Sequence, residues 1–201
     1  EARILLNEDP VKTEGGLSSG NAGESSNFLC YRALRLNYYA VTGLLARVCL
    51  YAGQRENAFN YSTEVIKASN NGIFPFVDRS LVNGTAQDPD RIFSPEVLFA
   101  LSDSQRGELF EEYFDPSLAP NMVFRMETDL LEQTIYGGTG TGGNLDDYRC
   151  RSNWISSGSA RYFYKYSDMT ESGRIENTMI PLLRLGEMYL IAAESQSNSL
   201  A

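Results

Sequence analysis

The pattern of apolar and polar positions predicts two helices in the first third of the chain. Apolar residues recur at steps of three or four over residues 29–52, at Leu34, Tyr38, Val41, Leu45, Val48 and Ala52. The same spacing recurs over residues 55–69, at Ala58, Tyr61, Val65 and Ala68. Side chains at this spacing share one face of a helix. Because the connection is short, we expect the two helices to form an antiparallel hairpin.

A third helix is predicted over residues 181–194. Pro181 suits the first turn of a helix. Apolar side chains surround almost the whole circumference, and a single polar stripe interrupts them, at Arg184, Glu187 and Glu194. A helix that is apolar nearly all round is buried between neighbours. We therefore expect the three charged side chains to be paired and structural, because a buried charge needs a partner.

The hairpin also fits a degenerate tetratricopeptide repeat. Leu45 and Ala46 stand where that repeat has Leu-Gly, and Ala58 stands at its later small position. One repeat cannot bury its own face, so partner helices must lie elsewhere. The predicted fold is mainly α, with tetratricopeptide-like helical hairpins (an α-α superhelix), long irregular loops and a few short strands.

The remaining segments are loop-rich. Residues 1–28 are expected to form a loop, and residues 71–179 an insert of short elements. Within the insert, the pattern favours extended chain at 96–101, 122–125 and 161–166, and short helices at 107–114 and 127–136. Residues 137–144 form a glycine-rich loop.

Composition and charge exclude several classes of function. The chain has 201 residues, no histidine and a formal net charge of −9. A nucleic-acid partner is not expected, because the phosphate backbone would be repelled. A Ser-His-Asp or Cys-His site cannot be built without histidine. Cys30, Cys49 and Cys150 show no C-x-x-C spacing, and Cys49 is expected as a buried thiol. No apolar run of about 18 residues predicts a membrane-spanning helix.

Three weaker motifs could indicate a nucleotide site, a catalytic site or a metal site. Residues 138–143 satisfy G-x-G-x-x-G, but no strand precedes them and no helix follows, so a surface loop is favoured. Four carboxylates recur at helical spacing, at Glu108, Glu111, Glu112 and Asp115. Such a cluster could serve glycoside hydrolysis, but a solvated helix face is the favoured interpretation. The acidic pairs Asp88/Asp90 and Asp146/Asp147 lack the pattern of a calcium loop. We expect no catalytic residue, metal or cofactor.

Candidate ligand-binding residues gather around the chain's one tryptophan. Trp154 lies in a polar stretch with Asn153 and Arg151, and Tyr148 is close in sequence. Flat rings stack on the apolar faces of sugars, while amides and guanidinium groups bond the hydroxyls. The alternative for Trp154 and Tyr148 is core packing, which is also the expectation for Tyr162, Tyr164 and Tyr166.

Two long motifs give the chain a family resemblance. Residues 37–53 resemble the SusD/RagB helix N-x-Y-A-x-x-x-L-L-A-R-x-Y-L-Y-x-G, with Cys49 where the family prefers Tyr. Residues 180–194 resemble the family's I-P-x-x-R-x-x-E-x-Y-L-I-x-A-E-A. Shorter similarities lie between them, to x-E-x-I-F at 95–99, D-x-R at 147–149 and x-K-Y at 164–166. Order and spacing agree over residues 28–196.

The resemblance implies a non-catalytic binding protein of the bacterial outer membrane. Residues 1–201 would be an internal part of one SusD/RagB-like domain, divided into a loop (1–28), a hairpin (29–70), an insert (71–179) and the helix of a further repeat (180–201). The family's members are surface lipoproteins, whose lipid anchor would lie outside this chain. They pass oligosaccharides or other nutrients to a SusC-like TonB-dependent transporter. The alternatives are a protein-binding scaffold of the import complex and a peptide-binding RagB-like member.

Overall fold

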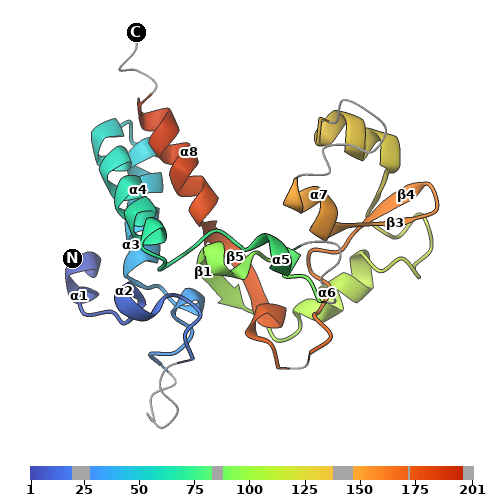
Figure 1. The fold of residues 1–201 in the computed structure, drawn as a ribbon, viewed down its shortest axis with the longest axis horizontal. Helices are drawn as coiled ribbons and strands as arrows, with labels where there is room; N and C mark the ends of the chain where they lie inside the picture. Colours follow the sequence, from blue (N-terminus) through green and yellow to red (C-terminus); the bar gives the residue numbers. More distant parts are fainter. Residues whose placement is uncertain (20–27, 83–87, 138–146, 172, 197–201) are drawn as a thin grey trace. The chain divides into compact units, whose positions relative to one another are not determined.

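The computed structural model describes residues 1–19, 28–82, 88–137, 147–171 and 173–196, and these form two compact units (Figure 1). The helical unit comprises Glu1–Phe76, Pro95–Ser102 and Ile180–Ala201. The inserted unit comprises Val77–Ser94 and Asp103–Met179. The predicted class is confirmed: helices predominate in the described chain, with short strands and irregular connections between them. The assignment of residues 1–201 to one domain stays a prediction.

A helical hairpin forms the centre of the helical unit. It consists of α3 (Tyr38–Tyr51) and α4 (Arg55–Asn70). Gly53, with φ +73°, makes the turn between them, a conformation that glycine adopts without strain. The prediction of α4 is confirmed, and Ala58, Val65 and Ala68 are buried as its pattern indicates.

The prediction that the first helix begins at residue 29 was wrong. Residues Arg32–Leu34 form a 3-10 turn (η1), Arg35 is extended, and α3 begins only at Tyr38. The cause is Asn37, whose side-chain oxygen accepts the Ala40 N–H at 2.9 Å as an N-cap. Its amide also donates to the carbonyls of Arg32 and Leu98, so the cap is tied to the core.

The predicted buried face of α3 was also wrong. Val48, placed on that face, is 60% exposed. The face turned to the core instead carries mostly small residues, at Ala40, Thr42, Gly43, Ala46 and Cys49, with Tyr39 beside them. The periodicity of the larger apolar residues therefore indicated the wrong side of the helix. The core side carries small residues, which let neighbouring helices approach closely. Cys49 is a buried free thiol, as expected.

The last helix starts later than predicted. Residues Met179–Arg184 form a strand, β5, which pairs with β1 (Val97–Ser102), and α8 begins at Leu185 and ends at Gln196. Pro181 thus lies in a strand rather than a first helical turn, which a two-stranded sheet tolerates at its edges. The predicted strand at 96–101 is confirmed as β1.

Helix α8 packs beside both helices of the hairpin (Figure 1). Its N-terminal end lies near the middle of α3, where Met188 contacts Gly43, and Arg55 beyond the end of α3 donates to the Glu194 carbonyl. Helix α8 therefore runs in the same direction as α3, as the first helix of a second repeat would. Its buried side carries Leu185, Met188 and Ile191. Burial all round was predicted wrongly, since Leu190 is 72% exposed.

The close packing at Gly43 leads us to expect that a larger side chain there destabilises the fold. A Cβ at this position would lie 2.8 Å from Leu183 Cδ2 and 3.2 Å from Met188 Sδ. We expect Gly43→Val to lower the free energy of unfolding by about 1–3 kcal/mol through overpacking. Urea unfolding followed by circular dichroism measures the change. Gly186→Val is the control, because a Cβ at Gly186 meets no atom within 4 Å. Equal losses in the two variants would contradict close packing as the cause.

Short helices precede the hairpin where a loop was predicted. Helix α1 covers Ala2–Leu5 and α2 covers Val11–Glu14. They are anchored by Asp9, whose carboxylate pairs with Arg32 at 2.8 Å and accepts the Tyr38 N–H at 3.1 Å. The N-terminal segment is thereby joined to the beginning of α3.

The inserted unit is built on a three-stranded antiparallel sheet. The strands are β2 (Arg125–Glu127), β3 (Trp154–Ser157) and β4 (Ala160–Phe163), in the order β2-β4-β3. Around it lie α5 (Arg79–Val82), α6 (Arg106–Tyr113), η3 (Leu130–Ile135), α7 (Tyr148–Asn153) and η4 (Ile175–Thr178), and a 3-10 turn η2 (Ser94–Glu96) leads into β1. Helix α6 confirms the prediction for 107–114. The helix predicted at 127–136 is shorter, a π-helical turn that follows strand β2.

Candidate functional site

The predicted ligand residue Trp154 lies inside the inserted unit. It begins β3 and is 8% exposed. Its indole Nε1 donates to the Tyr136 hydroxyl at 3.2 Å. Its ring lies 5.1 Å from Phe163 and 6.1 Å from Phe124, between centroids. Packing and a satisfied hydrogen bond thus fix the orientation of the indole.

The other three predicted residues lie on α7, the helix that directly precedes Trp154. Asn153 is buried, and its side-chain oxygen accepts the Ser152 hydroxyl at 3.2 Å. Tyr148 is partly buried against a small apolar cluster of Val77, Val82 and Phe93. Arg151 is half-buried. Their part in ligand binding stays a prediction.

An exposed ring covers the buried indole. Phe124 is 51% exposed, and its ring lies against Phe114, Trp154 and Phe163 at centroid distances of 5.9, 6.1 and 6.1 Å. We call these four residues the aromatic platform. The backbone of Phe124 is held to α6, since the Phe124 N–H donates to the Tyr113 carbonyl at 2.9 Å. Within the platform, Phe124 is therefore the most exposed ring, Phe114 and Phe163 are partly buried, and Trp154 is buried.

Tyr136 connects the platform to a neighbouring ion pair. The Tyr136 hydroxyl accepts from Trp154, and the Arg149 guanidinium lies 5.9 Å from the Tyr136 ring centre. Arg149 binds Asp147 in bidentate fashion, with Nε–Oδ1 at 3.0 Å and a terminal nitrogen–Oδ2 distance of 2.6 Å. The Arg149 side chain is 65% exposed and that of Asp147 is 18% exposed. Tyr136 thus links the buried Trp154 to an exposed ion pair.

The local electrostatics keep the ion pair charged. The hydrogen bonds from the Arg149 side chain hold the pKa of Asp147 below its ordinary value, despite partial burial. The same hydrogen bonds raise the pKa of Arg149. Burial raises the pKa of Tyr136, so its hydroxyl keeps its proton. At neutral pH this surface offers guanidinium and hydroxyl donors beside carboxylate and phenolic oxygen acceptors.

Sequence reasoning missed Phe124, Tyr136 and Arg149 as site residues. Phe124 gave no signal, because it precedes a strand of only three residues. Tyr136 precedes the predicted glycine-rich loop 137–144, and residues 138–144 of that loop, including the G-x-G-x-x-G match, fall outside the described residues. The D-x-R similarity at Asp147 and Arg149 was the one usable pointer, and it marked an ion pair without indicating its neighbours.

The acidic side chains of α6 face solvent. Glu108, Glu111 and Glu112 are exposed. The nearby Asp115 has a pKa held below its ordinary value by hydrogen bonds from Ser117. These observations favour the predicted solvated face over a pair of catalytic carboxylates.

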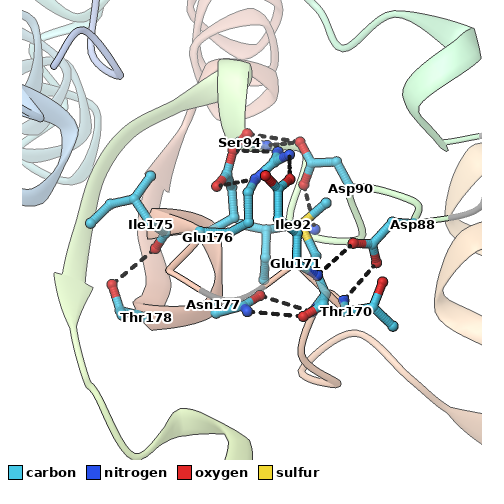
Figure 2. Close-up of polar contacts among 12 residues, drawn as sticks. Asp88, Asp90, Ile92, Ser94, Thr170, Glu171, Ile175, Glu176, Asn177 and Thr178 are labelled. Atoms are coloured by element: carbon cyan, nitrogen blue, oxygen red, sulfur yellow. Dashed lines mark hydrogen bonds and ion pairs between the residues drawn. The ribbon is translucent and has the colours of Figure 1, made fainter.

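The acidic segment 88–90 binds backbone groups. Asp88 accepts the Thr170 and Glu171 N–H groups at 3.1 and 3.4 Å (Figure 2). Asp90 accepts the Ser94 N–H at 2.7 Å and the Ser94 hydroxyl at 2.8 Å. Within the described ranges, no group of three or more metal-ligating side chains is assembled. Both carboxylates therefore serve as loop anchors in the structure, and Asp146 of the second acidic pair lies outside the described residues.

The buried carboxyl of Asp90 predicts a pH effect on stability. Burial raises its pKa, and the neighbouring Glu176 carboxylate adds to the rise against the hydrogen bonds from Ser94 and Ile92. An acid with a raised folded-state pKa stabilises the fold fully below its ordinary pKa, about 3.9, and this contribution is lost as pH rises through the raised value. We expect the difference in unfolding free energy between wild type and Asp90→Asn to fall as pH rises from about 4 to 7.

Urea unfolding at a series of pH values measures this difference. Asp78→Asn is the control, because hydrogen bonds from Ser80 lower the pKa of the exposed Asp78 carboxyl. A lowered pKa gives a contribution that is lost as pH falls, so the control difference should have the opposite slope. A flat or rising difference for Asp90→Asn would contradict the prediction.

A groove of about 390 Å³ lies in the helical unit, between α3 and α8. Its lining comprises Arg47, Leu50, Tyr51, Glu187, Leu190, Ile191 and Glu194. Arg47 crosses it and binds Glu187 at 2.6 and 2.7 Å. The structural role predicted for Arg184 and Glu187 agrees with this pair and with Arg184–Glu96 at 3.6 Å, whereas Glu194 is exposed. Tyr51 and Leu190 are 86% and 72% exposed, so the groove is open to solvent, and its lining mixes apolar and charged side chains.

Comparison with solved structures supports the fold. A Bacteroides vulgatus protein described as sugar-binding is 24% identical, with a TM-score of 0.50 over 80% of this chain and 35% of that protein. A SusD superfamily protein of Bacteroides thetaiotaomicron is 21% identical, with a TM-score of 0.43 over 80% and 37%. A SusD-like carbohydrate-binding protein of Bacteroides vulgatus is 18% identical, with a TM-score of 0.48 over 99% and 39%.

The chain shares its fold with the first of these proteins. The chain spans little more than a third of each compared protein. No protein-family model and no curated sequence matches it. Among the described residues, no helix has the length and apolar character needed to cross a bilayer.

Proposed function

We propose that this chain belongs to the SusD/RagB family and binds oligosaccharide without turning it over. One observation carries the proposal: the exposed ring of Phe124 lies over the buried Trp154, which is linked through Tyr136 to the Asp147–Arg149 ion pair. A ring face with hydrogen-bonding groups beside it suits a pyranose, whose faces are apolar and whose edge carries hydroxyls. The shared fold with a protein described as sugar-binding supports it.

The wider setting follows from the family proposal. The protein would be lipid-anchored at the outer face of the outer membrane and would pass its ligand to a SusC-like TonB-dependent transporter. The ordered motifs at residues 37–53 and 180–194 support this setting. No residue of the aromatic platform is proposed as catalytic, and the exposed carboxylates of α6 give no sign of an acid–base pair.

Calorimetry of the full-length protein against a glycan panel tests the proposal. We expect saturable binding of at least one oligosaccharide, with no release of shorter products when the mixture is analysed by chromatography. Binding of peptides in place of glycans would assign the protein to the peptide-binding branch. Product release would overturn the non-catalytic assignment.

A protein-binding role is the second candidate, and the groove between α3 and α8 favours it. Its lining combines the exposed side chains of Tyr51 and Leu190 with the Arg47–Glu187 pair. Helical-repeat surfaces of this kind bind partner proteins. Co-purification with a transporter, without binding of any glycan or peptide, would favour this scaffold role.

A further inference from the structure

We propose that the aromatic platform selects neutral saccharides over acidic ones, and that the Asp147–Arg149 ion pair sets this preference. The inference rests on the proposed glycan-binding function and specifies its ligand class. Arg149 has an exposed guanidinium that contacts Tyr136, the partner of the Trp154 indole. Both of its bonds to Asp147 are short, so its charge is already balanced.

A paired guanidinium can still bind hydroxyl groups. Arginine has five N–H donors, and the bidentate pair uses two of them. The remaining N–H groups can donate to a sugar hydroxyl or ring oxygen, which brings no charge. A uronic acid or sulfated sugar at the same place would bring its anion close to the Asp147 carboxylate, and like charges repel.

The ion pair cannot adjust easily to an acidic ligand. Asp147 Oδ1 also accepts the Arg149 backbone N–H at 2.9 Å, as the N-cap of α7, so its position is fixed. Protonation would remove its charge, but the Arg149 side chain keeps its pKa low. The carboxylate therefore stays charged and stays in place at neutral pH.

A second ion pair and the charge of the whole chain act in the same direction. Arg161 on β4, near α7, is itself paired with Glu132 of η3, and both side chains are largely buried. The whole chain carries a formal net charge of −9, which repels anions at long range. These observations favour a neutral ligand.

Binding to two glycan sets tests the inference with the full-length protein. The neutral set is maltohexaose, cellohexaose, xylohexaose and mannohexaose, and the acidic set is hexagalacturonate, an alginate hexamer and a heparin hexamer. We expect the tightest neutral ligand to bind wild type at least about tenfold more strongly than any acidic ligand. Calorimetry at low and high salt measures the affinities.

Asp147→Asn is the decisive variant, because its side-chain oxygen can still cap α7 while the guanidinium loses its anion. We expect affinity for the acidic set to rise about tenfold at low salt, with neutral affinity changed less than about threefold. Asp129→Asn is the matched control: Asp129 is exposed and its side chain makes no cap hydrogen bond, so the same charge is removed without freeing Arg149. Circular dichroism confirms that each variant is folded.

The outcomes separate the inference from the proposed function. An acidic glycan that binds wild type as tightly as the neutral ones would overturn the inference and leave glycan binding intact. A folded Asp147→Asn variant without any gain for acidic ligands would overturn the role of the ion pair. Failure of every glycan to bind would overturn the proposed function, and the inference with it.

Discussion

Replacement of Asp9 by Ala lowers the free energy of unfolding by an expected 3–5 kcal/mol, that is, about the cost of breaking a buried ion pair. The side chains of Asp9 and Arg32 are only 1% and 5% exposed, and the variant leaves the guanidinium buried without its anion. It also removes the acceptor for the Val11 and Tyr38 N–H groups, the second of which begins α3. Urea unfolding followed by circular dichroism measures the loss.

Two comparisons identify the buried charge as the cause. Glu171→Ala breaks an exposed pair with Arg174, where the Glu171 side chain is 70% exposed, and should cost less than about 1 kcal/mol. The double variant Asp9→Leu/Arg32→Met should recover part of the loss, because apolar side chains can replace a buried ion pair. A loss for Asp9→Ala no larger than that for Glu171→Ala would contradict the prediction.

The Asp9 pair should also respond to acid. Burial alone would raise the pKa of Asp9, but Arg32 and the two backbone N–H groups hold it below its ordinary value. The stability that the pair provides is therefore present at neutral pH and is lost as pH falls through the lowered pKa. Its pH dependence is thus opposite in sign to that of Asp90, whose pKa is raised.

The fold was predictable where local signals agree with packing. In α4 the apolar spacing, the preceding turn and the buried residues coincide, so its bounds and its face were both predicted well. In α3 they conflict. The side chain of Asn37 stops the helix from extending toward the N-terminus, and the core side is lined by small residues that apolar periodicity undervalues.

The start of α8 shows a different limit. Residues 179–184 have apolar side chains that fit a helix or a strand, and only pairing with β1 decides between them. That partner lies about 80 residues earlier in the chain, so no local pattern could reveal it. The Asp9–Arg32 pair is likewise invisible in sequence, because it joins residues that share no motif or helical spacing.

The candidate site was predictable only in part. A lone tryptophan among polar residues directed attention to the correct strand, but Trp154 forms the base of the platform rather than its surface. The exposed ring, Phe124, comes from a segment 30 residues earlier. Ligand surfaces assembled from separate loops depend on tertiary contacts, which single-chain patterns do not encode.

Replacement of Phe124 by Ala should weaken oligosaccharide binding by about 10- to 100-fold, because truncating a central ring of a binding surface typically costs about 1.4–2.8 kcal/mol. Its exposed face is the part of the platform that a pyranose can reach, since Trp154 beneath it is buried. Calorimetry with the tightest ligand of the wild-type protein measures the loss. Phe124→Tyr keeps a flat ring and should bind within about threefold of wild type, whereas Phe124→Leu should lose most of the affinity.

The helical unit supplies a matched control for this prediction. Phe76 is 55% exposed and also contacts another ring, that of Tyr189 at 5.4 Å, so Phe76→Ala removes an exposed ring that is not part of the platform. We expect this variant to bind glycan as the wild type does. Thermal unfolding of each variant separates binding from packing, because Phe124→Ala also removes contacts with Phe114 and Phe163. A folded Phe124→Ala protein with unchanged affinity would move the glycan site away from the aromatic platform.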